Sequence, residues 1–249
     1  MGRERFQKTG LKPAWSVFPE LEPVEGISTP SIQVKTRKRA RSQKVDHSTA
    51  ATQNIKATTI SFSTIHQYGE LYINFLKARK KTFIDQLGWN LPQTEGMEFD
   101  QYDTPQCRWV VIHEFGEVLG GVRLSPTTAS CGVYSYMLRD AQKGILENIP
   151  SDVLFFDAPV DERTWEASRL FLASDLPAQR RQSVQAVLMD ALSQSAREQG
   201  AVSVIGIVPY VWSRWLRRLN LSAVAVGPKF SIDGTTSQAA LFNIGAKLH

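Results

Sequence analysis

The stretch QRRQSVQAVLMDALSQSAREQGAVSVIGIV, residues 179–208, decides the fold. Residues 179–199 place apolar side chains along one stripe at helical spacing, and Gly200 is a typical helix end. Residues 202–208 form a largely apolar run, which is typical of a strand buried on both faces. A long amphipathic helix followed by a buried strand predicts an α/β architecture, in which the helix covers one face of a sheet. The stripe consists of Val184, Val187, Leu188, Ala191, Leu192 and Ala196.

The segments on either side supply further strands and helices. Residues 71–83 repeat apolar side chains near helical spacing, and shorter helices are expected at 136–142 and 212–219. Together these elements predict a three-layer α/β/α sandwich with a mixed central sheet. Strand-like patterns occur at 59–63, 108–115, 118–124, 165–173, 224–232 and 241–244.

The charge of the 249-residue chain is unevenly distributed. Residues 1–57 carry 11 Lys and Arg against 5 Asp and Glu, whereas residues 58–249 carry 18 against 19. The apolar residues within 1–57 show no helical or strand period. We therefore expect residues 1–57 to be a basic, disordered extension and residues 58–249 to be the folded domain. The basic run at 35–44 indicates either a nucleic-acid contact or a solvated tail.

Cysteine and histidine usage argues against a disulfide framework and a metal site. The two cysteines cannot form a zinc quartet, and the four histidines are scattered, so we expect no metal and no cofactor. Residues 1–6 lack the apolar segment of a signal peptide, and no apolar run is long enough to span a membrane. We therefore expect a cytoplasmic protein.

One candidate group of functional residues surrounds the end of the first predicted helix. Arg79 and Phe83 are four residues apart and share a helix face, and Trp89 follows the helix. An arginine with two aromatic rings is suited to a sulfonium and an adenine, which favour cation–π and stacking contacts. Core packing beside a surface arginine would explain the same residues.

Charged residues also occur where burial would be costly. Asp100 and Asp103 lie three residues apart on a predicted loop, and Arg123 and Glu166 lie in predicted central strands. In a regular strand Arg169 faces away from Glu166. Because buried charges must be paired, we expect Glu166 to pair with Arg123, or Asp103 with Arg169. A purely structural ion-pair network would fit the same pattern.

Four ordered motifs within residues 58–245 resemble the signature of the acyl-homoserine-lactone synthases. The resemblance implies a fold similar to the acetyltransferase (GNAT-like) sandwich, and it implies that the charged and aromatic residues above line or brace one site. The motifs are Arg79-x-x-x-Phe83-x-x-x-Leu87-Gly88-Trp89, Glu98-x-Asp100-Gln101-Tyr102-Asp103, Gly121-Val122-Arg123-Leu124 and Trp165-Glu166-x-Ser168-Arg169.

The resemblance also implies an acyltransferase reaction. The amine of S-adenosylmethionine, a substrate and not a cofactor, attacks an acyl thioester. The carboxylate then closes an N-acyl-homoserine lactone, a quorum-sensing signal, and methylthioadenosine leaves. Because the attacking amine must be neutral, a carboxylate has to accept its proton, and Glu166 is our candidate base. We assign Asp103 and Arg123 to catalysis with it, and substrate binding to Arg79, Phe83, Trp89, Asp100 and Arg169.

The acyl donor is expected to be an acyl carrier protein rather than CoA. CoA-dependent acetyltransferases grip pyrophosphate with a glycine-containing loop that opens the long helix, and residues 179–186 contain no glycine. There are two alternatives. One is a CoA-dependent N-acetyltransferase of the same fold, and the other is a non-catalytic nucleic-acid-binding protein that uses the basic tail. Arginines that could face an acidic carrier, or form a solvated helix face, are Arg180, Arg181, Arg214, Arg217 and Arg218.

We predict that the lactone product is not mainly a 3-oxo species. Pro209 stands where many members of the resembled family have Thr or Ser, whose hydroxyl is associated with 3-oxo chains. Proline cannot donate a hydrogen bond to the C3 carbonyl. Such a bond is worth about 0.5–1.5 kcal/mol and an unmet one costs about 1–3 kcal/mol, which is enough to bias selection roughly tenfold. Mass spectrometry of extracts from an expressing host checks this. Dominant 3-oxo lactones would contradict it, and Tyr210→Phe and Ser213→Ala variants would then locate the hydroxyl.

Overall fold

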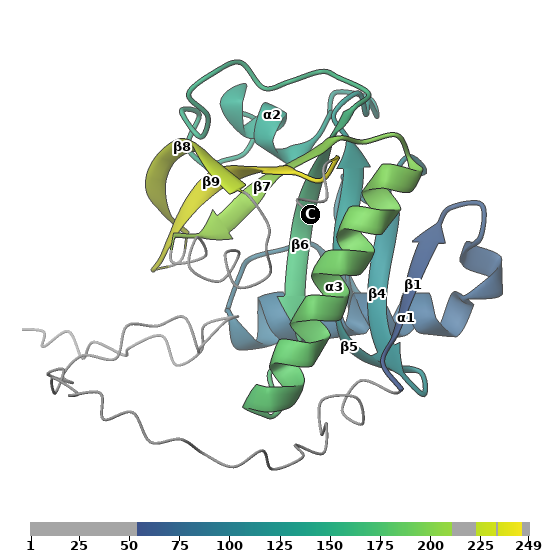
Figure 1. Cartoon of the computed structure of the whole chain (residues 1–249). Helices are drawn as coiled ribbons and strands as arrows, with labels where there is room; N and C mark the ends of the chain where they lie inside the picture. The colour runs from purple at the N-terminus through teal and green to yellow at the C-terminus, as the bar shows by residue number, and fades with distance from the viewer. Residues whose placement is uncertain (1–53, 211–222, 233, 246–249) are drawn as a thin grey trace, which may run out of the picture.

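The computed structural model describes residues 54–210, 223–232 and 234–245, which form a seven-stranded mixed sheet with helices against both faces (Figure 1). The expected extension up to residue 53 and the expected helix at 212–219 lie outside the described residues. The α/β sandwich predicted from the sequence is thereby confirmed. The strand order is β1-β4-β5-β6-β7-β9-β8, and β6–β7 is the one parallel pair within this sheet.

The helices and strands have the following bounds. The helices are α1 (Gly69–Lys80), which continues as a π-helix (Lys81–Gln86), α2 (Met137–Gln142) and α3 (Ala178–Glu198), with a 3-10 turn at Ile65–Gln67. A small separate ribbon pairs β2 (Gln93–Thr94) with β3 (Met97–Glu98). The sheet strands are β1 (Lys56–Ser61), β4 (Arg108–Glu114), β5 (Glu117–Pro126), β6 (Thr164–Leu172), β7 (Ser203–Pro209), β8 (Ala223–Ile232) and β9 (Thr235–Asn243).

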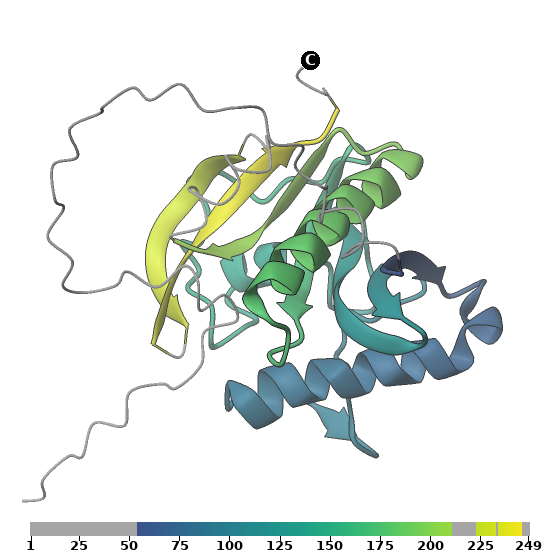
Figure 2. The same cartoon turned by 60° about the horizontal axis from the view of Figure 1, so that its bottom comes forward.

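Alternating side chains of the central strands separate the core into layers. Val110 and Ile112 of β4 pack on the face covered by α3, where the apolar stripe of that helix is buried. Trp109 and Val111 point to the other face, which α1 covers with Phe75. Figure 2 shows α1 and the π-helix as one continuous rod. A third cluster packs α2 against β7, β8 and β9. Each large buried side chain stabilises the fold by about 1.5–3 kcal/mol.

Strands β6 and β7 part from each other midway along the sheet. Their pairing covers Thr164–Ala167 against Ser203–Gly206 and goes no further, and Figure 1 shows β7 leaning away from β6. A Cβ atom on Gly206 would lie 2.6 Å from the carbonyl oxygen of Ala167. Only glycine therefore allows the close approach of the two backbones at the last paired position.

Two expected boundaries differ in the structure. Strand β1 begins at Lys56, two residues before the expected domain start, because Lys56 and Ala57 pair with the edge of β4. Strand β9 begins at Thr235 and not at residue 241, because its polar first half pairs with both β7 and β8. Within the described residues, no helix is both long and apolar enough to cross a membrane.

We predict that a chain starting at Asn54 keeps the thermal unfolding midpoint of the full chain, and with it the synthesis expected from the sequence. A chain starting at Phe62 should lose more than about 3 kcal/mol of unfolding free energy, because it loses β1 and the fully buried Ile60. It should also aggregate, since the apolar edge of β4 becomes exposed. Calorimetry and a lactone assay on both chains check this. Equal stability of the two truncated chains would contradict it.

Candidate active site

Six charged side chains from four parts of the chain meet on the face of the sheet that α1 covers. We call them the arginine–carboxylate network. None of the side chains is more than 9% exposed, so the charges are almost completely removed from solvent. The network consists of Arg79 of α1, Arg123 of β5, Arg169 of β6, Glu98 of β3, and Asp100 and Asp103 of the following loop.

The distances show how the network is connected. Arg79 donates through Nε to Glu98 at 2.6 Å and through both Nη atoms to Asp103 at 2.7 and 3.0 Å. Arg123 Nη1 lies 2.5 Å from Asp100 and 3.0 Å from Asp103. Arg169 donates to Glu98 at 3.2 Å and to Asp100 at 2.7 Å. Each carboxylate therefore bridges two arginines.

The network keeps its two aspartates ionised. Burial alone would raise the pKa of Asp100, but Arg123 and Arg169 hold that pKa below its ordinary value. Burial likewise opposes ionisation of Asp103, and Arg123 and Arg79 hold its pKa far below the ordinary value. Neither aspartate is thus able to accept a proton at neutral pH.

Aromatic rings surround the network. Trp89 stacks on Phe83 with ring centroids 5.1 Å apart, and the guanidinium of Arg169 lies 5.7 Å from the centre of the Phe83 ring. The structure therefore brings Phe83 and Trp89 together, as expected from their spacing. The Nε1–H of Trp109 also donates to Asp103 at 2.8 Å.

The orientation expected for Arg169 was wrong. Arg123 pairs with Ser168 and Gly121 with Phe171, so two residues of β6 stand opposite Val122 alone. This is a β-bulge, and Arg169 adopts a left-handed backbone conformation with φ of 54°. The bulge turns its side chain toward the face that carries Arg123.

The two expected ion pairs were also wrong. Arg123 and Asp103 have other partners, as described above, and Arg169 pairs with Glu98 and Asp100. Glu166 instead accepts backbone N–H groups of Met137 at 3.0 Å and Leu138 at 2.7 Å. The physical reason is that the first N–H groups of a helix, here α2, have no partner within it.

The pKa of Glu166 is raised. The residue is fully buried, and burial raises its pKa to about 7, although the two N–H donors act in the opposite direction. A carboxylate with this pKa exchanges its proton near neutral pH, as general bases do.

Sequence reasoning did not assign Glu98 to the site. It is fully buried and holds Arg79 and Arg169 through its two oxygens. The signal was its place two residues before Asp100, since alternate residues of an extended segment share a face.

Arg180 and Arg181 differ in their surroundings. Arg180 forms an ion pair with Glu114, and both side chains are partly exposed. Arg181 is buried and donates to the carbonyl of Ser174 at 2.9 Å, so it fixes the start of α3. The carrier contact stays a prediction, and its other arginines, Arg214, Arg217 and Arg218, lie outside the described residues.

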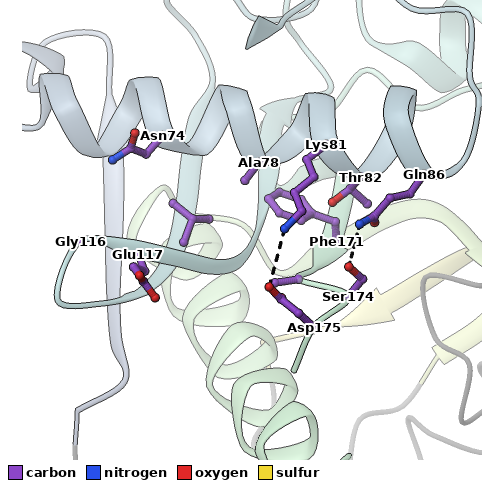
Figure 3. Close-up of a pocket in the computed structure, with 12 residues that line it drawn as sticks. Asn74, Ala78, Lys81, Thr82, Gln86, Gly116, Glu117, Phe171, Ser174 and Asp175 are labelled. Carbon is purple, nitrogen blue, oxygen red and sulfur yellow. Dashed lines mark hydrogen bonds and ion pairs between the residues drawn. The ribbon is translucent and has the colours of Figure 1, made fainter. Parts of the chain in front are cut away.

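A pocket of about 370 Å³ lies between α1, the π-helix and the β4–β5 turn (Figure 3). The ion pair of Lys81 with Asp175 and the hydrogen bond of Gln86 to Ser174 bridge its walls. None of the predicted site residues lines it, so it is separate from the arginine–carboxylate network. The described residues also hold no group of three potential metal ligands.

Comparison with known proteins identifies the family. Residues 65–246 match the family model described as autoinducer synthase. The chain is 32% identical over 182 residues to an acyl-homoserine-lactone synthase of Acinetobacter nosocomialis, covering 70% of this chain and 92% of that protein. The structure of TofI in a ternary complex with an inhibitor and MTA is 28% identical, with a TM-score of 0.59, over 77% of this chain and 91% of that one.

A further solved structure supports the fold. BjaI, described as a CoA-dependent acyl-homoserine lactone synthase with SAM and isopentyl-CoA, is 23% identical with a TM-score of 0.61, over 76% of this chain and 83% of that one. The chain thus belongs to the autoinducer synthase family, and it is an acyl-homoserine-lactone synthase.

Proposed function

We propose that the amine of S-adenosylmethionine attacks an acyl thioester beside Glu166, after which the lactone closes and methylthioadenosine leaves. The observation that carries this assignment is Glu166 itself, a fully buried carboxyl with a pKa of about 7. It lies in β6, the strand that also carries Arg169 of the network. MTA bound in the related TofI structure supports the leaving group.

Arg169 is the best-placed arginine to hold the substrate carboxylate. The side chains of Arg79 and Arg123 have no exposed surface, whereas that of Arg169 is 9% exposed. The stacked rings of Phe83 and Trp89 lie against it and suit the sulfonium and the adenine through cation–π and stacking contacts. These contacts support substrate binding near the end of the π-helix that continues α1.

Glu166 accepts the amine proton directly or through one water. Asp103 and Arg123 contribute by position, because Asp103 stays ionised and Arg123 holds Ser168 at 3.1 Å on the strand that carries Glu166. The thioester oxygen would meet main-chain N–H groups where β6 and β7 part. Lactone closure then requires mainly positioning, because the sulfonium is already a good leaving group.

The start of α3 favours an acyl carrier protein as donor. Residues 178–181 contain no glycine, whereas phosphate-binding loops at helix starts use glycine to let the pyrophosphate approach the backbone N–H groups. Arg180 is the arginine of this turn with a partly exposed side chain, and it could meet an acidic carrier. Both kinds of donor are made in the cytoplasm, where we place this enzyme.

We predict faster turnover with octanoyl-acyl carrier protein than with octanoyl-CoA, measured as release of free thiol and of lactone. Arg180→Glu should raise the KM for the carrier donor about tenfold and leave the KM for octanoyl-CoA unchanged, because it reverses a charge that faces the carrier. Arg163→Glu, immediately before β6 begins, is the matched control. Faster turnover with octanoyl-CoA would refute the donor assignment, and the absence of lactone with either donor would refute the proposed reaction.

We predict that Glu166→Gln lowers turnover by roughly 10²–10⁴-fold, the usual range for a general base. In the wild type, kcat/KM should increase as the pH rises to about 7, because Glu166 must be deprotonated to act as the base. The variant should lack this increase. Glu117→Gln, at the exposed start of β5, is the control. Wild-type turnover in a folded Glu166→Gln protein would refute the assignment.

Stability provides a second readout on the same variant. Because the pKa of Glu166 is raised from 4.5 to about 7, the folded state binds more protons than the unfolded state between these values. The unfolding free energy of the wild type should therefore fall as pH rises across this window. The contribution of this residue should be absent in Glu166→Gln.

A further inference from the structure

The side chain of Tyr102 packs against Arg123 of the network. It is 4% exposed, and its ring lies 5.6 Å from the guanidinium carbon of Arg123. Its backbone N–H donates to Asp100 at 2.9 Å, and its carbonyl accepts the thiol of Cys107. The ring and the backbone are thus both held, so the hydroxyl has little freedom to move.

The Tyr102 hydroxyl is buried and has no hydrogen-bond partner among the residues that the structure describes. Buried hydroxyl groups are normally hydrogen-bonded, and an unmatched one destabilises the fold. By contrast, the hydroxyl of the neighbouring Tyr136 donates to the carbonyl of Pro159 at 2.6 Å. The Tyr102 hydroxyl is therefore available to a molecule that enters the site.

Two buried carboxylates influence this hydroxyl, Asp140 more strongly than Glu166. Asp140 accepts the backbone N–H and the hydroxyl of Ser135 at 2.9 and 2.5 Å, and Glu166 accepts two N–H groups of α2. Burial raises the pKa of Tyr102 most, followed by the charge of Asp140 and the interaction of its carboxylate with the hydroxyl, and Glu166 adds less. The hydroxyl therefore stays protonated at neutral pH. Tyr102 can thus donate a hydrogen bond but cannot serve as the base.

The charges around Glu166 come from several elements. Arg123 of β5 lowers its pKa and Asp100 of the loop raises it, both less than burial does. Its two oxygens each accept one N–H group, and a carboxylate has capacity for about four hydrogen bonds. Glu166 can therefore accept a further proton donor without losing the helix.

We propose that Tyr102 is a positioning residue for the proton transfer, and that its hydroxyl holds the water molecule through which Glu166 takes the proton of the attacking amine. The inference rests on the proposed function of Glu166. The amine loses one proton to the water as its nitrogen bonds to the thioester carbon, and the water passes a proton to Glu166. The carbon–sulfur bond then breaks, and the donor leaves as a thiolate that takes up this proton and restores the Glu166 carboxylate. Tyr102 keeps its own proton throughout.

The test is Tyr102→Phe, which removes only the hydroxyl and keeps the ring over Arg123. With octanoyl-acyl carrier protein and S-adenosylmethionine, kcat should fall by about 10²-fold, the size of effect that misplacement of a reacting group causes. The KM for S-adenosylmethionine and the thermal midpoint should stay near wild type, because the hydroxyl forms no hydrogen bond to another described residue. The rise of kcat/KM near pH 7 should move to higher pH, since a donor to the charged form of Glu166 is lost.

Tyr134→Phe is the matched control. The ring of Tyr134 packs edge-on against the ring of Tyr102, but Tyr134 is only half-buried. Wild-type kcat in folded Tyr102→Phe would overturn the inference. A fall in kcat that accompanies a lower thermal midpoint, with an unchanged pH profile, would also overturn it, because a purely structural hydroxyl gives that result.

A double variant separates this inference from the base assignment. If both residues act on one proton transfer, Tyr102→Phe/Glu166→Gln should be about as slow as Glu166→Gln alone. Losses that multiply would overturn the role of Tyr102 and leave Glu166 as the base. Wild-type turnover of Glu166→Gln would remove the base assignment, and the inference with it.

Discussion

The rest of the site depends on the burial of three arginines with three carboxylates. Moving one charge out of water costs several kcal/mol even after relaxation, and removing one member of a buried pair costs about 3–5 kcal/mol. Because each carboxylate bridges two arginines, no member can leave without leaving another charge unmatched. Strands β5 and β6, α1 and the loop after β3 must therefore assemble in one arrangement.

The backbone of Arg169 shows what this arrangement costs. A residue other than glycine with positive φ carries strain of about 1–3 kcal/mol. The bulge would be unfavourable in an isolated sheet, and the two carboxylates that meet Arg169 offset it. Apolar side chains of similar volume would avoid both the strain and the desolvation. Retention of the charges at such a cost fits a role in binding substrate.

Much of the fold could be predicted from the sequence, because periodicity reports which face of an element is buried. Residues 179–208 gave α3 and β7, and ordered motifs indicated which residues gather at the site. The direction in which the Arg169 side chain points could not be predicted. A β-bulge arises from the pairing of two strands, and the sequence of one strand alone does not reveal it. The partner of Glu166 was missed for a similar reason: α2 is only six residues long, and its docking on β6 is tertiary.

Glu166 does not form the expected ion pair with Arg123, and this explains how the site combines buried cations with a base that works at neutral pH. An arginine in direct contact would have stabilised the charged form of Glu166 and lowered its pKa. Asp100 and Asp103 occupy Arg123 instead, and their own pKa values fall as a result. Glu166 receives only two backbone N–H groups, which do not outweigh burial. Among the residues that the structure describes, Glu166 therefore forms no ion pair, and its proton affinity stays in the range that an amine can use.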